Sequence, residues 1–136
     1  MLTDQPAQLS LTQLFDALPD GVVYYQAMRD ATNQRITDFI IDYANPAAQK
    51  HVQAWYQATI GTSVRHDNQH DRATADQVFA QLKAVIETGQ PGESEYHNQA
   101  LNEWLSVTRT KAGDGVLNVY RNITASRQAS LINERQ

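Results

Sequence analysis

The sequence of 136 residues contains no cysteine. Without a thiol, the chain cannot form a disulfide, bind a metal through thiolate sulfur or use a cysteine nucleophile. Covalent flavin photochemistry needs a reactive cysteine and is excluded for the same reason. The absence also fits a protein that works in a reducing compartment.

Long apolar runs and basic clusters are also missing. No stretch is long and apolar enough to cross a bilayer, and residues 1–6 lack the basic start and apolar stretch of a secretory signal. We therefore expect a cytoplasmic domain with no membrane contact of its own. The net charge of -4, from 11 Lys and Arg against 15 Asp and Glu, argues against a nucleic-acid partner. A Gly-rich phosphate loop and a dinucleotide-binding fingerprint are absent as well.

The length suits one domain, and apolar periodicity predicts its elements. The leucines of residues 7–18 are spaced as on one helical face, which a Pro-Asp-Gly turn at 19–21 ends. The longest amphipathic helix is predicted over 71–88, where a glycine follows. Other predicted elements are strands over 22–25, 35–44, 93–98, 104–110 and 116–120, and helices over 45–56 and from 124 onward. This order predicts an α+β fold with an antiparallel sheet and excludes a doubly wound dinucleotide-binding sheet.

The most informative stretch is a strand that runs directly into a capped helix. Phe39, Ile41 and Tyr43 alternate with their neighbours at the two-residue period of a strand. Asn45 is placed to accept a hydrogen bond from a free N–H of the first helical turn, and Pro46 suits the first helical position because its missing donor costs nothing there.

Three local sequences resemble those of PAS sensory domains. Asp-Gly-Val-Val at 20–23 resembles the first family strand. Ile-Asp-Tyr-Ala-Asn-Pro-Ala at 41–47 resembles the second strand and its helix cap. Tyr-Arg-Asn-Ile-Thr-Ala-Ser-Arg at 120–127 resembles the closing strand and its junction with an output helix. In order and spacing they match the family over residues 14–130. The resemblance implies a five-stranded antiparallel sheet with helices packed on one face, flanking helices at both ends, and a pocket between sheet and helices.

The resemblance also implies an organisation and a function. Residues 1–18 would form an N-terminal flanking helix, 19–123 the PAS domain and 124–136 the start of an output helix. Such domains sense small ligands or mediate dimerisation, and they relay signals to a C-terminal effector in a longer parent protein. We expect a non-enzymatic module of a signalling protein in a two-component system, with a histidine kinase as the favoured effector and the leucine-bearing first helix as a homodimer surface.

The expected signal relay comprises Asn122, Ile123 and Thr124. Thr124 is a candidate cap for the output helix. Asn122 stands where the family usually has aspartate, so a charge-based coupling at this junction is replaced by hydrogen bonds alone.

Candidate pocket residues are the apolar and aromatic side chains of the predicted strands and helices. Such side chains are core by default, and no periodicity separates a cavity from a filled core. The candidates are Tyr24, Phe39, Ile41, Tyr43, Val52, Trp55, Val64, Phe79, Leu82, Trp104 and Val107.

The histidines offer weak cofactor signals. His66 and His70 have the four-residue spacing of two ligands on one helical face, but their surroundings are wholly polar, so we predict a solvated segment and no metal site. His51 lies on the apolar side of the predicted short helix, where a satisfied buried histidine is the simpler interpretation. The resemblance adds haem as an alternative, because some PAS domains bind haem through a helical histidine. The resemblance leaves a non-covalently bound ligand open, and His97 has no identifiable partner in the sequence.

Two other functions stay open at this point. One is a PAS-like domain with a filled core that only dimerises and spaces other domains. The other is a small α+β enzyme of the hydratase–isomerase type, with His51 or an aspartate in its cavity. Asp38 and Asp42, four apart on a regular strand, are expected to share its exposed face and offer no catalytic pair.

Overall fold

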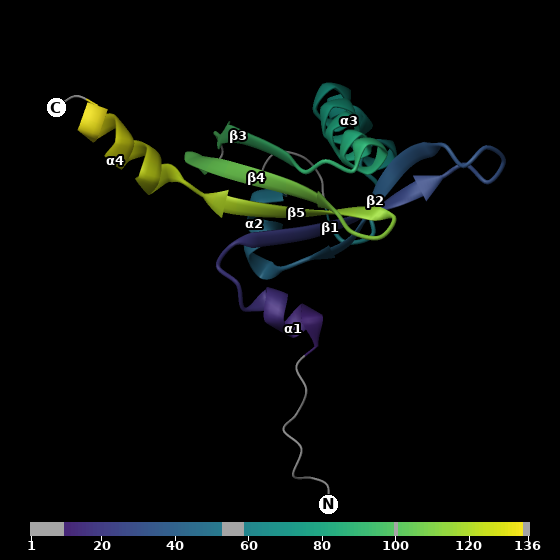
Figure 1. The fold of residues 1–136 in the computed structure, drawn as a ribbon, viewed down its shortest axis with the longest axis horizontal. Coiled ribbons are helices and arrows are strands. Elements are labelled where there is room, and N and C mark those ends of the chain that lie inside the picture. The colour runs from purple at the N-terminus through teal and green to yellow at the C-terminus, as the bar shows by residue number, and fades with distance from the viewer. Residues whose placement is uncertain (1–9, 53–58, 100, 135–136) are drawn as a thin grey trace, which may run out of the picture.

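The computed structural model describes residues 10–52, 59–99 and 101–134 (Figure 1). Its elements are α1 (Leu11–Asp16), β1 (Gly21–Arg29), β2 (Ile36–Ala44), α2 (Pro46–Val52), the 3-10 helix η1 (His66–Asp71), α3 (Arg72–Thr88), β3 (Gly92–Asn98), β4 (Glu103–Lys111), β5 (Gly115–Asn122) and α4 (Thr124–Glu134). Within this part of the chain, no helix combines the length and apolarity that a bilayer crossing requires.

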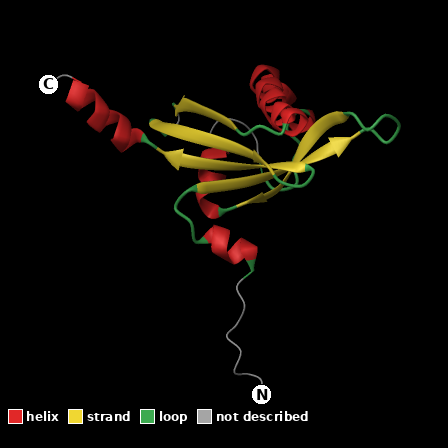
Figure 2. Cartoon of the chain, in the orientation of Figure 1, coloured by secondary structure: helices red, strands yellow, loops and turns green. Residues whose placement is uncertain are grey.

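The five strands form one antiparallel sheet in the order β2-β1-β5-β4-β3. Strands β1 and β5, from opposite ends of the domain, lie side by side at its centre (Figure 1). Helices flank the sheet, with α1 on the side opposite α3 (Figure 2). The predicted α+β fold class with a five-stranded antiparallel sheet is confirmed.

The core lies between one sheet face and helices α2 and α3. From the helices it takes Ala48, Leu82, Val85 and Ile86, and from the sheet Val23, Tyr25, Phe39, Ile41, Val107 and Val116. Asp71 caps the first turn of α3 by accepting from Thr74 N, and Gly89 ends the helix with φ 72°. The predicted span of this helix is therefore confirmed almost to the residue.

Strand β2 departs from a regular exposed strand in two places. Tyr24 pairs with Tyr43, but Tyr25 pairs with Ile41, so a β-bulge leaves Asp42 without a partner on β1. Asp38 is buried, not exposed as predicted, because the segment before α3 lies against it. Its carboxylate accepts the backbone N–H groups of residues 39, 65 and 66 and so ties β2 to the segment before α3.

Helix α1 is shorter than the predicted 7–18 span and begins at a capping box formed by Ser10 and Gln13. Its leucine stripe does not pack on the domain, since Leu11, Leu14 and Leu18 are 70%, 48% and 43% exposed. The helix instead docks on the outer sheet face through Phe15 and Asp16, which contact Tyr43 by ring packing and a short hydrogen bond.

The contact between Tyr43 and α1 predicts an alkaline transition. Partial burial, followed by the hydrogen bond to Asp16, raises the pKa of Tyr43 from 10.0 to about 12. The stability this contact provides is thus complete below pH 10 and is lost as the pH rises toward 12. In a spectrophotometric titration, Tyr43→Phe should remove the tyrosine that ionises near pH 12. In unfolding experiments between pH 10 and 12, the same variant should lose less free energy of unfolding than the original protein. If the variant instead lacks a tyrosine that ionises near pH 10, the assignment to Tyr43 is wrong.

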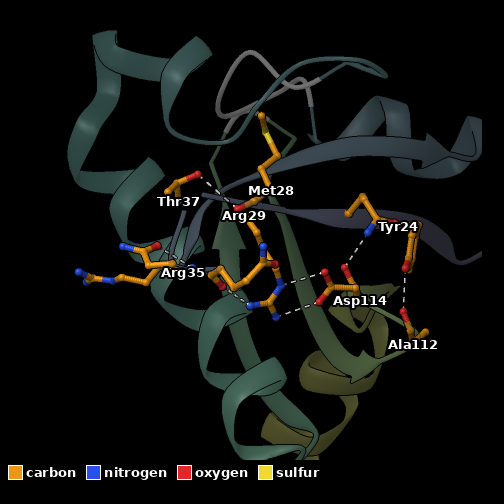
Figure 3. Close-up of polar contacts among 10 residues, drawn as sticks. Tyr24, Met28, Arg29, Arg35, Thr37, Ala112 and Asp114 are labelled. Carbon is orange, nitrogen blue, oxygen red and sulfur yellow. Dashed lines mark hydrogen bonds and ion pairs between the residues drawn. The ribbon is translucent and has the colours of Figure 1, made fainter. Parts of the chain in front are cut away.

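The turn between β4 and β5 is tied to the β1–β2 hairpin (Figure 3). Arg29 donates from Nε and Nη2 to the two carboxylate oxygens of Asp114, each at 3.0 Å, and from Nη1 to the Gln34 carbonyl. This pairing holds the pKa of the Asp114 carboxyl below its usual range. Tyr24 adds a hydrogen bond from its hydroxyl to the Ala112 carbonyl at 2.7 Å. The contacts fix the end of the sheet that carries this turn.

Candidate functional site

A pocket of about 460 Å³ lies between α3 and the inner faces of β3, β4 and β5. Val78, Val107 and the Tyr96 ring supply apolar surface. Most other lining groups are polar, with glutamines from α3 and hydroxyl, amide and guanidinium groups from the three strands. The pocket is thus more polar than most small-molecule sites, and it offers several hydrogen-bonding groups beside a small apolar wall.

Arg109 is the buried cation of this pocket. It occupies the third inward position of β4, after Leu105 and Val107, and is only 8% exposed. Its Nη2 donates to Gln81 Oε1 on α3 and to Ser94 Oγ on β3, both at 3.0 Å. Burial, which disfavours the charged form, lowers the pKa of Arg109, yet an arginine remains protonated at any physiological pH.

Tyrosine and asparagine side chains of β1 and β5 continue the polar wall. The hydroxyls of Tyr25 and Tyr120 lie 3.3 Å apart, and Asn118 Nδ2 donates to Tyr120 Oη at 3.2 Å. Asn118 Oδ1 and Asn98 Nδ2 are buried and have no hydrogen-bond partner among the described residues. Two amide groups, one acceptor and one donor, are thus available to a molecule in the pocket.

The structure places most sequence-predicted pocket residues elsewhere. Val107 lines the pocket, whereas Phe39, Ile41, Val64 and Leu82 are buried in the core and Phe79 packs against it. Tyr24, Tyr43 and Trp104 do not line it. They contact the β4–β5 turn, α1 and α4, respectively. Nothing is described for the side chain of Val52, and Trp55 lies outside the described residues.

The reason for this difference is chemical. Large apolar side chains pack against one another near β1 and β2 and fill that part of the interior, while the pocket forms where the inward positions of β3 to β5 are polar. One sequence signal was available, because Arg109 continues the inward alternation of Leu105 and Val107. A charge at an inward strand position marks a polar cavity or an ion pair.

The residues considered for metal binding have other roles. His66 and His70 are exposed. Asp67 accepts from Ser63 N and Oγ, and these two bonds lower the pKa of its carboxyl. Among the described residues, no group of three or more His, Asp or Glu side chains is placed to hold a metal ion. The side chain of His51, the haem candidate, lies outside the described set.

The predicted relay residues join β5 and α4 to the start of β4. Ile123 N donates to the Trp104 carbonyl at 2.8 Å, and Trp104 N donates to Thr124 Oγ1 at 2.9 Å. The Thr124 hydroxyl therefore binds β4 and does not act as the predicted helix cap. Asn122 takes part in two bonds, accepting from Thr124 N on Oδ1 at 2.9 Å and donating from Nδ2 to Glu103 Oε2 at 2.7 Å.

Arg127 fastens the first turn of α4 to the sheet. Its guanidinium lies 3.8 Å from the centre of the Trp104 ring, and Nη1 pairs with Glu95 Oε1 of β3 at 2.9 Å. Beyond this point α4 extends away from the sheet (Figure 1) and exposes Leu131 and Ile132. Among the described side chains of α4, those at its start contact the domain, and Leu131 and Ile132 do not bury against it.

No protein-family model and no curated protein matches the sequence. Solved structures of similar fold include two domains. A domain of an HTR-like protein from Haloarcula marismortui is 19% identical, with TM-score 0.50 over 79% of this chain and 100% of that one. A C-terminal domain from Streptococcus mutans is 18% identical, with TM-score 0.60 over 92% of this chain and 96% of that one. At these identities the similarity shows a shared α+β fold.

Proposed function

We propose that this chain is a regulatory PAS module of a signalling protein, in which occupancy of the pocket changes the position of α4. One observation carries the proposal: β3 contributes to both sites. Ser94, Tyr96 and Asn98 line the pocket, while Glu95 between them holds Arg127 of α4. Because a strand shifts as one unit, a ligand that moves β3 also changes the support of α4.

Assignment to the PAS family is part of this proposal. Its support is the agreement of three local sequences, at 20–23, 41–47 and 120–127, with the order and spacing of that family, together with the five-stranded fold. The proposal extends to a cytoplasmic parent protein with a C-terminal effector, for which a histidine kinase is the favoured type, and assigns no catalytic reaction to the domain itself.

The proposed homodimer uses α1. Leu11 and Leu14 of the helix and Leu18 just after it are exposed, while Phe15 of the same helix contacts the domain. Burial of such a stripe against a second copy would remove apolar surface from water. The same stripe supports the second candidate, a dimerisation module that spaces other domains and senses no ligand.

The hydratase–isomerase alternative has little support in the pocket. Acid–base catalysis of that kind needs a carboxylate and a histidine within reach of one another. Of the pocket residues, Glu95 is paired with Arg127, and His97 Nε2 is 3.0 Å from Asn102 Oδ1. These contacts direct both groups to other partners.

The proposed relay is tested in a fusion protein in which α4 connects the domain to a reporter histidine kinase. The test introduces a negative charge at Asn122. Asn122→Asp places a carboxylate against Glu103 Oε2, where a donor now lies at 2.7 Å. Repulsion should loosen the junction and change kinase autophosphorylation several-fold, because each lost charge-assisted bond corresponds to roughly 1 to 3 kcal/mol. Adding Glu103→Gln should restore the original output, because the amide can donate to the new carboxylate.

The control for this experiment is the isolated domain carrying the same substitutions. Circular dichroism should show an unchanged fold, and light scattering should show whether the dimer persists. Kinase output that is the same in the fusion, the single variant and the double variant would reject the relay. It would leave the spacer role as the better account.

A further inference from the structure

The charge inside the pocket is not balanced by the protein. Arg109 is buried, and the two atoms that accept from its Nη2, Gln81 Oε1 and Ser94 Oγ, are both neutral. Among the described residues, no carboxylate lies within ion-pair distance of its guanidinium. A buried cation is costly unless an anion pairs with it, so the pocket favours a negatively charged occupant.

The other ionisable groups of the pocket do not supply this anion. Glu95, the carboxylate in the lining, is paired with Arg127 of α4 at 2.9 Å. His97 is in contact with Asn102 and the Trp104 ring. The positive charge of Arg109 is therefore left facing a cavity of about 460 Å³.

Two buried amides refine the chemistry of the occupant. Asn98 Nδ2 is a donor without a partner among the described residues, which suits a second contact to an anionic oxygen. Asn118 Oδ1 is an acceptor that also has no partner among the described residues, which suits a hydroxyl or amino group on the same molecule. Both residues line the pocket and are nearly inaccessible, at 3% and 2% exposed, so leaving either amide atom without a partner is costly.

We propose that the pocket binds a small organic carboxylate that carries a hydroxyl or amino group, with Arg109 as the counter-ion. The inference rests on the proposed sensory function and deepens it by naming the class of ligand. The Nε and Nη1 groups of Arg109 donate to none of the described residues, so each is free to donate a charge-assisted hydrogen bond to a carboxylate oxygen. The carbon skeleton of the ligand packs on Val78 and Val107, an apolar wall that inorganic phosphate would not use.

The test is calorimetric titration of the folded domain with lactate, malate, glycine and succinate, alongside lactamide and succinamide. At least one hydroxy or amino acid should bind, and the matched neutral amide should bind at least about tenfold more weakly, because a charge-assisted bond is lost. Arg109→Gln should weaken the binding about 10- to 100-fold. Arg121→Gln, a matched change at a side chain of β5 that is 71% exposed, should leave it unchanged.

A second variant keeps the test decisive should Arg109→Gln fail to fold. Arg109→Lys keeps the positive charge but replaces the planar guanidinium, with its several N–H donors, by a single ammonium group. This variant should bind the carboxylate about tenfold more weakly than the original protein. Absence of binding by every carboxylate at about 10 mM overturns the inference. Equal binding of the amides, or an equal loss with Arg121→Gln, overturns it too.

The ligand class and the signalling role can fail separately. Carboxylate binding that depends on Arg109, with no response of the kinase fusion, supports the ligand class and removes the signalling role. A kinase response to Asn122→Asp without carboxylate binding retains the relay and overturns the ligand class.

Discussion

Replacing Asn45 with aspartate is expected to lower the free energy of unfolding by about 3 to 5 kcal/mol. Asn45 is fully buried, and its amide has four hydrogen bonds. Oδ1 accepts from Val22 N and Ala48 N, and Nδ2 donates to the carbonyls of Phe15 and Asp20. A carboxylate keeps the two accepted bonds but places an oxygen against two carbonyl oxygens, and the two repel each other strongly because the site is shielded from solvent.

Urea unfolding followed by circular dichroism measures this loss. Asn33→Asp is the matched control, because Asn33 lies in the exposed β1–β2 turn and uses only its oxygen, as the acceptor for Arg35 N. That change should cost less than about 0.5 kcal/mol. The Asn45→Asp loss should become smaller at acidic pH, where the new carboxyl is protonated and can donate one bond. Equal stability of the two variants would contradict the role assigned to Asn45.

The second large effect is expected for Gly115→Ala, which should cost about 3 kcal/mol. Gly115 is buried at the start of β5, where an added Cβ would overlap the Tyr24 hydroxyl and lie 2.5 Å from the Tyr25 carbonyl oxygen. The carbonyl belongs to the backbone of β1 at the centre of the sheet, so neither strand can move aside without loss of pairing.

Gly92→Ala is the matched control for this substitution. Gly92 also begins a strand, but an added Cβ there would be 3.5 Å from Val85 Cγ2, which is an ordinary contact. Because alanine is less flexible than glycine in the unfolded chain, this variant should be as stable as the original protein or up to about 1 kcal/mol more stable. Unfolding midpoints that coincide for the two variants would show that the contact at Gly115 is relieved in solution.

Local signals account for the parts of the fold that the sequence predicted. The Asn45 cap was recognisable because a capping side chain and the N–H it accepts are three residues apart, as the bond to Ala48 N confirms. The span of α3 followed in the same way from its apolar stripe and from Gly89. The bonds of Asn45 to the segment before β1 were not predictable, since Phe15 is 30 residues away.

The errors have a common cause. The exposed position predicted for Asp38 was wrong because the segment before α3 covers it and donates two backbone N–H groups to its carboxylate. The predicted cap role of Thr124 was wrong because its hydroxyl oxygen accepts a hydrogen bond from Trp104 N on β4. In both cases a contact between distant segments outweighed a local preference.

By itself the sequence determined the order of the strands and of the main helices, because these follow from periodicity and from caps a few residues apart. Only the tertiary structure decided which part of the interior is filled and which part is open. Alternation placed Arg109 inward with Val107, but the pocket exists because α3, β3 and β5, brought together by the fold, present polar groups to that guanidinium. The balance between packing and cavity depends on how side chains from distant segments fit together, and that fit is set in three dimensions.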